Sequence, residues 1–355
     1  MKQILRIAAV LVLTATTSFA EEIAKTLPAE FDWVRNFKKY DGNPIIRPQG
    51  KWAADMIFNP AAIVKDGRVG LLCRAVNLEE KTGGSEWSVS SLIWAWSDDG
   101  YEFTLDEKPF LHPTVAWPLA GKCQYPGGFE DPRIVFIPEE KLYVLCFTGV
   151  RHIPATATEG ERWHTPALIA WSKDLKNWEW GPETFPNRAV CITPQKVNGR
   201  YWAYWDNSTL KTSWSEDLRT WHHTGNSAIR QRNGMFDSVL CEAVASPIMG
   251  ESGILLLYNG AMGGEQRTNY MSRWTKCYAK GNFNVYQVGW ALFDKNNPER
   301  PIARSAEPIV SPTEPFERFG FVNGTVFASG LVNFKGKWFL YYGCADNRIA
   351  VAVAE

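Results

Sequence analysis

Acidic side chains at two distant places in the 355-residue sequence could carry out acid–base chemistry. The first place is Glu130-Asp131-Pro132-Arg133, and the second is Glu242. Cleavage of a glycosidic bond requires two carboxyl groups, one that protonates the leaving oxygen and one that acts on the opposite side of the sugar. Taken alone, Asp-Pro is more often a turn, and Glu130 with Arg133 could form a surface ion pair. The fold therefore decides whether these groups form a site.

A repeated strand pattern predicts how the carboxyl groups could meet. Five copies of a hairpin unit each contain a β-rich run, a turn and a second apolar strand. The copies begin at Asn59, Asp131, Thr193, Ala245 and Asn323. A third strand follows each hairpin, and three of these strands share a Trp-Ser motif, at Trp96-Ser97, Trp171-Ser172 and Trp214-Ser215. Radial stacking buries both faces of such units, so we expect an all-β, five-bladed β-propeller over residues 21–355.

Propeller geometry predicts where the site lies, because the innermost strand of each blade starts at one rim of the central channel. We expect the following residues to converge at that rim: Asn59, Asp131, Thr193, Glu242 and Asn323. Arg74 and Asp346 end inner hairpins, and the blade register points both toward the same rim. Asp131 and Glu242 are the acidic residues among the strand starts. They are therefore the candidate catalytic pair.

Composition favours a neutral ligand. Lys plus Arg and Asp plus Glu both number 38, so no single-sign field attracts nucleic acid or an anionic membrane surface. The 17 Trp residues fit a carbohydrate ligand, since flat aromatic rings stack on sugar faces, although Trp also fills β-cores.

Metal and cofactor chemistry is not expected. The seven cysteines lie far apart, without a CxxC pair or a histidine at zinc-site spacing, and no glycine-rich phosphate loop occurs. Cys73, Cys146 and Cys344 fall late in hydrophobic runs, where Cys acts as a small apolar residue rather than as part of a disulfide framework.

The N-terminus indicates export. Lys2 and Arg6 precede an apolar run over residues 7–13, and Ser18-Phe19-Ala20 fits signal-peptidase cleavage. Residues 1–20 are therefore interpreted as a signal peptide. The apolar run is too short for a permanent membrane span, so we expect a periplasmic or secreted protein without membrane insertion.

The motifs together resemble glycoside hydrolase family 130, the mannoside phosphorylases and β-mannosidases on a five-bladed propeller. The resemblance covers roughly residues 43–355. It rests on FNPAAI with LLCRA (58–75), GGFEDPRI (127–134), AWSKDLKNW (170–178), GWALFDKNNPERPIARS (289–305), and FVNGTVFASG with YYGCAD (321–346).

The resemblance implies roles for the residues at the rim and a mannose-containing oligosaccharide as the substrate. Asp131 corresponds to the family's general acid, which is thought to reach the glycosidic oxygen through a sugar hydroxyl. Asn59, Arg74 and Asp346 correspond to residues that contact the mannose. Arg133 matches the motif arginine and is expected to reach the substrate as well.

The departures from the family pattern predict a hydrolase. Where the family's phosphorylases bind phosphate with a His-Arg pair, a Lys and a His, this sequence has Trp205 and Asp206, no Lys, and Asn259. A dianion in a partly desolvated site needs cationic or multiple N–H donors, so the phosphate site is interpreted as lost. We therefore expect inverting hydrolysis of β-mannosides, with β-1,2 linkages as the family implies.

The base has several candidates. Glu242 is the first choice because it shares the rim with Asp131, and the rivals are Asp237, Asp206 and Glu265. Glu265 lies in the 260–284 loop, which is expected to cover the pocket and contact the leaving-group sugar.

Three other functions remain open from the sequence. A β-mannoside phosphorylase would release mannose 1-phosphate on the same fold. The five-bladed arabinanases and xylosidases use a first-blade Asp as base, but Asn59 holds that position here. A non-catalytic sugar-binding propeller is the third alternative.

Overall fold

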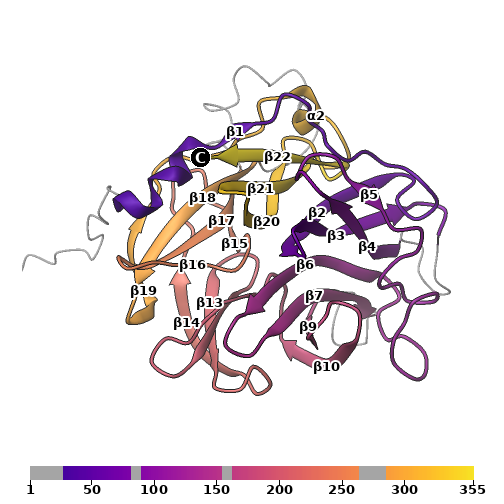
Figure 1. The fold of residues 1–355 in the computed structure, drawn as a ribbon, viewed down its shortest axis with the longest axis horizontal. Helices are drawn as coiled ribbons and strands as arrows, with labels where there is room; N and C mark the ends of the chain where they lie inside the picture. The colour runs from indigo at the N-terminus through magenta and orange to yellow at the C-terminus, as the bar shows by residue number, and fades with distance from the viewer. Residues whose placement is uncertain (1–26, 81–88, 154–161, 264–284) are drawn as a thin grey trace, which may run out of the picture.

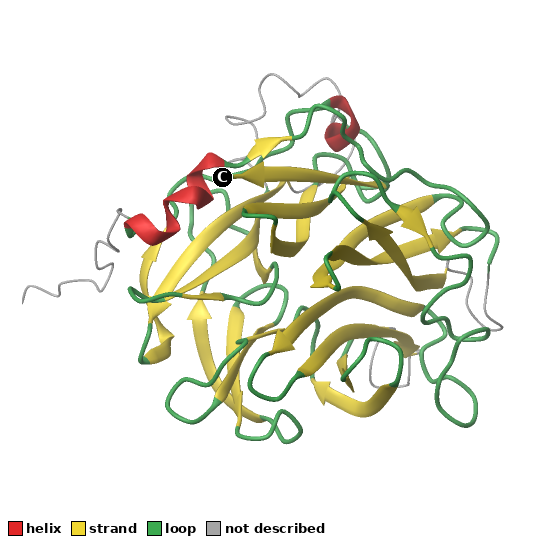
Figure 2. Cartoon of the chain, in the orientation of Figure 1, coloured by secondary structure: helices red, strands yellow, loops and turns green. Residues whose placement is uncertain are grey.

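A computed structural model describes residues 27–80, 89–153, 162–263 and 285–355. Within these ranges the chain is mainly β-strand, with a short 3-10 helix η1 (Ala29–Asn36) and one helical turn α2 (Pro315–Arg318) (Figure 2). The all-β expectation is confirmed. No helix in the described ranges is long and apolar enough to cross a membrane. The predicted signal peptide, residues 1–20, lies outside them.

The first two antiparallel units share one nine-stranded sheet, in which β4 meets β6 through a single parallel pair, Ser90 with Gly128. The first unit contains β2 (Met56–Lys65), β3 (Arg68–Asn77), β4 (Val89–Ser97) and β5 (Thr104–Leu105). The second contains β6 (Gly128–Ile137), β7 (Leu142–Ile153), β9 (Ala167–Ser172) and β10 (Trp178–Phe185), with β8 (Arg162–His164) paired to β7.

The other three units are separate sheets. The third contains β11 (Cys191–Ile192), β12 (Tyr201–Trp205), β13 (Leu210–Ser215) and β14 (His222–Ile229). The fourth contains β15 (Leu240–Ala243), β17 (Ile254–Met262), β18 (Val285–Asp294) and β19 (Asn297–Arg304), with β16 (Ile248–Met249) paired to β17. The last contains β20 (Val326–Phe334), β21 (Lys337–Cys344) and β22 (Arg348–Ala354), and β1 (Lys38–Lys39) adds its outer strand.

The repeated third strand ends in the same turn each time. In the second unit the Ser172 hydroxyl accepts hydrogen bonds from the backbone N–H groups of Asp174 and Leu175, at 3.2 and 2.9 Å. The Asp174 carboxylate accepts two more from the N–H groups of Lys176 and Asn177. Ser97 with Asp99 and Ser215 with Asp217 form equivalent bonds. The Ser and Asp side chains accept hydrogen bonds from backbone N–H groups that have no partner where the strand ends, which explains the repeated Trp-Ser-x-Asp motif.

Neighbouring units share hydrophobic cores. Separate buried clusters join the first unit to the second, the second to the third, the third to the fourth, and the fourth to the last. A further cluster packs Leu71 and Ile93 of the first unit against Tyr341 and Val351 of the last. Figure 1 shows the units following one another in chain order around the centre of the molecule.

The described cysteines belong to these cores rather than to disulfides. Cys73, Cys146 and Cys344 are buried and unpaired, as the sequence predicts, and burial raises the pKa of each thiol. They act as small apolar side chains.

Candidate active site

Bulges at the starts of two inner strands aim Asn59 and Asp131 at the same place. Pairing of β2 with β3 shifts between Phe58 and Ala61, and pairing of β6 with β7 shifts between Glu130 and Arg133. Asn59 and Asp131 have φ angles of 45° and 48°, a region that Asn and Asp tolerate better than most residues. A proline follows each of them and offers no N–H to the ladder, which suits a bulge.

The two bulges open into a pocket of about 180 Å³. Its lining comes from every unit: Asn59, Arg74, Asp131, Arg188, Asn207, Leu240, Glu242, Tyr286, Val322, Thr325, Phe327 and Asp346. The structure thus places five of the predicted site residues together, namely Asn59, Arg74, Asp131, Glu242 and Asp346.

Two of the expected rim residues lie elsewhere. Thr193 is buried, and its hydroxyl accepts a hydrogen bond from the backbone N–H of Trp202. Asn323 accepts one from the N–H of Gly320. The prediction that these two residues line the rim was wrong, because Thr193 follows β11 and Asn323 precedes β20. From the third and last units the pocket is lined instead by Arg188, Asn207, Val322, Thr325, Phe327 and Asp346.

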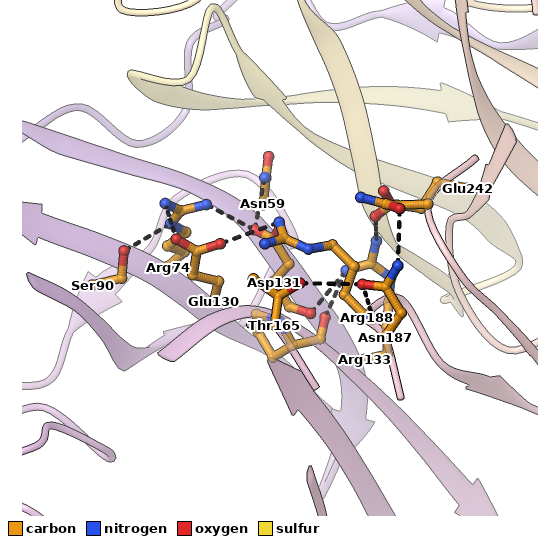
Figure 3. A network of polar contacts seen from close by, with 12 residues as sticks. Asn59, Arg74, Ser90, Glu130, Asp131, Arg133, Thr165, Asn187, Arg188 and Glu242 are labelled. Atoms are coloured by element: carbon orange, nitrogen blue, oxygen red, sulfur yellow. Dashed lines mark hydrogen bonds and ion pairs between the residues drawn. The ribbon is translucent and has the colours of Figure 1, made fainter. Parts of the chain in front are cut away.

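Arg188 is a site residue that the sequence analysis missed. It precedes β11 in the connection from the second unit to the third, and its guanidinium lies 3.2 Å from Glu130 and 3.5 Å from Asp131 (Figure 3). The available signal was its place shortly before an inner strand, whereas Asn59, Asp131 and Glu242 lie within their strands.

Asp131 is surrounded by positive charge and amide donors. The amide of Asn59 donates to Asp131 Oδ1 at 2.9 Å, and Arg74 Nη1 lies 3.4 Å from the same oxygen (Figure 3). Arg74 also bonds Glu130 at 2.5 Å and the Ser90 hydroxyl at 3.0 Å. These contacts hold the Asp131 carboxyl in one orientation at the pocket wall.

The pKa values of the pocket carboxyls are driven apart. Burial would raise the pKa of Asp131, but the charges of Arg74, Arg188 and Arg133 outweigh it and hold the pKa below its usual value. Burial raises the pKa of Glu242 to about 7 against the opposing charge of Arg133, and the nearby carboxylate of Asp131 adds to the rise. Burial likewise raises the pKa of Asp346 to about 7, against the charge of Arg74.

In the ligand-free pocket, therefore, Asp131 is ionised at neutral pH, whereas Glu242 and Asp346 are close to half-protonated. Two carboxyl groups with separated proton affinities in one pocket are candidates for acid–base chemistry, and in the free site the shared proton resides on Glu242 rather than on Asp131.

Arg133 does not line the pocket, contrary to the expectation that it contacts the substrate. Its side chain is 2% exposed and lies behind the wall, with Nη2 3.3 Å from Glu242 Oε1. The remaining donors bond backbone carbonyl groups of Asp131, Pro132 and Ala243. Its geometry suits support of the site rather than contact with sugar.

The rival bases are placed less favourably than Glu242. Asp237 is fully buried and accepts hydrogen bonds from Arg232, Arg304 and the Tyr258 hydroxyl, away from the pocket lining. Asp206 is held by Asn187 and Lys211, each at 2.7 Å. The predicted contact Glu265 lies outside the described residues.

The residues that the resemblance places where phosphate would be bound have structural partners here. Trp205 is buried and donates its indole N–H to the Ser213 hydroxyl. Asn259 is buried and forms two hydrogen bonds of 2.8 Å with the backbone of Ala328, which join β17 to β20. Within the described ranges, no group of three His, Cys, Asp or Glu side chains is arranged to hold a metal ion.

Comparison with known proteins decides the family. The family model described as beta-1,4-mannooligosaccharide phosphorylase matches residues 29–355. The chain belongs to glycoside hydrolase family 130. A fellow member, the β-1,2-mannobiose phosphorylase of Thermoanaerobacter sp., is 30% identical over 332 residues, which cover 89% of this chain and 96% of that protein.

Solved structures agree with membership of family 130. A glycosyl hydrolase from Bacteroides ovatus is 31% identical, with a TM-score of 0.75 over 93% of this chain and 95% of that chain. A second structure, also 31% identical with a TM-score of 0.75, covers 93% of this chain and 96% of that one. Its description states that the family of mannoside phosphorylases contains glycoside hydrolases that target β-1,2 mannosidic linkages in Candida mannan.

Proposed function

We propose that this family 130 member is a β-mannoside hydrolase that inverts the anomeric centre, with Asp131 as acid and Glu242 as base. The observation that carries the proposal is the Glu242 carboxyl, which lines the same small pocket as Asp131 and has a pKa of about 7. A base with a pKa near the working pH can take a proton from water and still be ionised often enough to act.

We also propose that the five units close into a five-bladed propeller. Support comes from the core shared by the first and last units and from β1, an early strand that completes the last unit. Closure of this kind leaves short protected edges and gathers the inner strand starts around one pocket.

The proposed chemistry uses one proton shared by the carboxyl pair. Between the low pKa of Asp131 and pH 7 the pair holds a single proton, mainly on Glu242. Turnover starts from the minor form in which Asp131 carries that proton. Asp131 donates it through a mannose hydroxyl to the glycosidic oxygen while Glu242 takes a proton from the attacking water. The C1–O bond breaks, and the step ends with Asp131 ionised and Glu242 protonated, which is the favoured form of the free site.

The charge balance of the pocket supports water rather than phosphate as the nucleophile. Among the described residues, Arg74 and Arg188 pair with Glu130 and Asp131, and Arg133 pairs with Glu242. A phosphate dianion would enter beside these carboxylates and would have to compete for donors that are already engaged.

Phosphorolysis is the second candidate. Arg188 lines the pocket and supplies a cation that an anion could use, and the Thermoanaerobacter relative is named a β-1,2-mannobiose phosphorylase. β-1,2-linked mannosides are the proposed substrates for either reaction, supported by the linkage in that name and in the description of the structural relative. Export to the periplasm or medium is proposed from residues 1–20.

A product assay separates the candidates. Incubation with a panel of mannobioses, with and without inorganic phosphate, is followed by NMR from the first turnover. Hydrolysis releases α-mannose first and does not depend on phosphate. Mannose 1-phosphate that forms only with added phosphate would reject the hydrolase proposal, and binding without turnover would indicate a sugar-binding propeller.

A further inference from the structure

Arg133 connects two units that share no strand pairing. It lies on β6 of the second unit, and its guanidinium reaches β15 of the fourth, with β11 of the third unit packed nearby. The residue is 3% exposed, so its charge is almost fully withdrawn from water. A buried guanidinium is tolerated only when its donors are satisfied, and Arg133 donates to three backbone carbonyls and to the Glu242 carboxylate.

On its own strand, Arg133 holds the bulge that presents the acid. Nη1 donates to the carbonyl oxygens of Asp131 and Pro132, both at 3.1 Å. The ladder between β6 and β7 shifts at these two residues, so their carbonyls need another donor. The positive φ angle of Asp131 is thereby stabilised by a side chain two residues later.

On β15 of the fourth unit, the same guanidinium holds Glu242, the proposed base. Nη2 lies 3.3 Å from Glu242 Oε1 and 3.1 Å from the carbonyl of Ala243, to which Nε also donates at 3.2 Å. The side chain and the following backbone group of Glu242 are therefore fixed by one rigid planar fork. Lysine has no such fork and could not reproduce these directions.

We propose that Arg133 is a positioning residue that sets the separation of the acid and the base and tunes the proton affinity of the base. This inference rests on the proposed roles of Asp131 and Glu242. Among the described residues, the strongest charge effects on the Glu242 carboxyl come from Arg133 and Arg188, which lower its pKa, and from Asp131 and Asp206, which raise it. Arg133 is the one in direct contact with this carboxyl. The thiol of Cys191 is a further titratable neighbour, and burial raises its pKa to about 12.

The test compares Arg133→Lys with Arg133→Met. Both variants lose the fork, so kcat is expected to fall about 10- to 100-fold, because a misplacement of about 1 Å between reacting groups has that effect. KM should stay within about threefold of the wild-type value, since Arg133 does not line the pocket. Methionine also removes the charge, so the alkaline limb of kcat/KM should move to higher pH, whereas lysine should leave it near its original position.

The pH measurement can distinguish Glu242 from Asp346, the other pocket carboxyl with a raised pKa, because different charges act on the two groups. The charges that act on Asp346 are those of Arg74, Asp131 and Glu130. If the alkaline limb belonged to Asp346, Arg133→Met would leave it in place. A limb that does not move in a folded Arg133→Met protein overturns the inference, as does a raised KM with unchanged kcat, which would indicate direct sugar contact.

A matched control separates positioning from general loss of stability. Arg304 is a similarly buried arginine that pairs with Asp237 rather than with Glu242. Arg304→Lys is expected to lower the thermal midpoint without moving the alkaline limb. If Arg133→Met does not fold, Arg133→Lys still decides through its kcat and KM.

A second readout keeps the inference separate from the proposed function. The Glu242 carboxyl resonance can be followed in protein labelled with ¹³C-glutamate, and Glu242→Gln assigns it. Its titration should move to higher pH in Arg133→Met even if the enzyme proves to be a phosphorylase. An unchanged titration refutes the tuning role, whereas phosphate-dependent products refute only the hydrolase.

Discussion

The pH dependence of turnover follows from the two carboxyl groups. We expect kcat/KM to fall above neutral pH, although ionisation of a base alone would make it rise. The pair must hold one proton in total, and the last proton leaves with a pKa of about 7, the value for Glu242. At pH 8 about one-tenth of the molecules, and at pH 9 about one-hundredth, keep that proton. We therefore expect kcat/KM to be flat in mild acid and to fall about tenfold per pH unit above 7. The acid limb lies below the ordinary pKa of Asp, because the pKa of Asp131 is lowered.

The assay is kcat/KM for the cleaved mannobiose at constant ionic strength. Asp131→Asn with β-mannosyl fluoride provides the control, since fluoride leaves with much less help from an acid. Only ionised Glu242 is then required, and removal of the Asp131 charge lowers its pKa. The rate of the variant should therefore rise with pH below 7 and level off, opposite to the wild type. A wild-type rate that climbs through pH 7, or a variant rate that falls there, would refute the shared-proton reasoning.

Three further predictions concern the base, the acid's support and the sheet contacts. Glu242→Gln should lower kcat about 10²- to 10⁴-fold, and azide should partly restore turnover as α-mannosyl azide; an unaffected kcat would place the base elsewhere. Gly343→Ala would put a Cβ 2.4 Å from Asn59 Oδ1, so kcat/KM should fall while the circular dichroism spectrum stays native; unchanged kinetics would show that the Asn59 amide is not needed. Asn259→Ala removes two buried hydrogen bonds to Ala328 and should lower the free energy of unfolding in urea by about 2–4 kcal/mol; a loss below about 1 kcal/mol would contradict that role.

Local patterns in the sequence were sufficient for the strands and for much of the site. Alternating apolar runs and turn residues predict the hairpins, and the Trp-Ser-x-Asp motif marks the turns seen after the third strands. Asn59 and Asp131 could be placed because a proline and a hairpin follow each of them, so their position within the unit was visible. Arg74 and Asp346 followed from the ends of the first and last hairpins.

Loop positions could not be predicted in the same way. Arg188 lies between two units, where no strand period indicates which way a side chain points. Thr193 and Asn323 were assigned to the rim as starts of inner strands, but Thr193 follows β11 and Asn323 precedes β20 by three residues. Each side chain there accepts a hydrogen bond from a nearby backbone N–H. Arg133 was expected at the sugar because its motif stands beside the acid, yet the bulge turns it behind the pocket wall.

The sequence by itself determined the β-rich fold class, the repeated units and the acidic residues available for chemistry, because these depend on local periodicity and residue type. The tertiary structure decided how those residues behave. Only packing of the units around one pocket buries Glu242 and Asp346, surrounds Asp131 with Arg74 and Arg188, and places Arg133 across the gap to the base. Proton affinity depends on burial and on charges from distant parts of the chain, and neither is visible until the chain is folded.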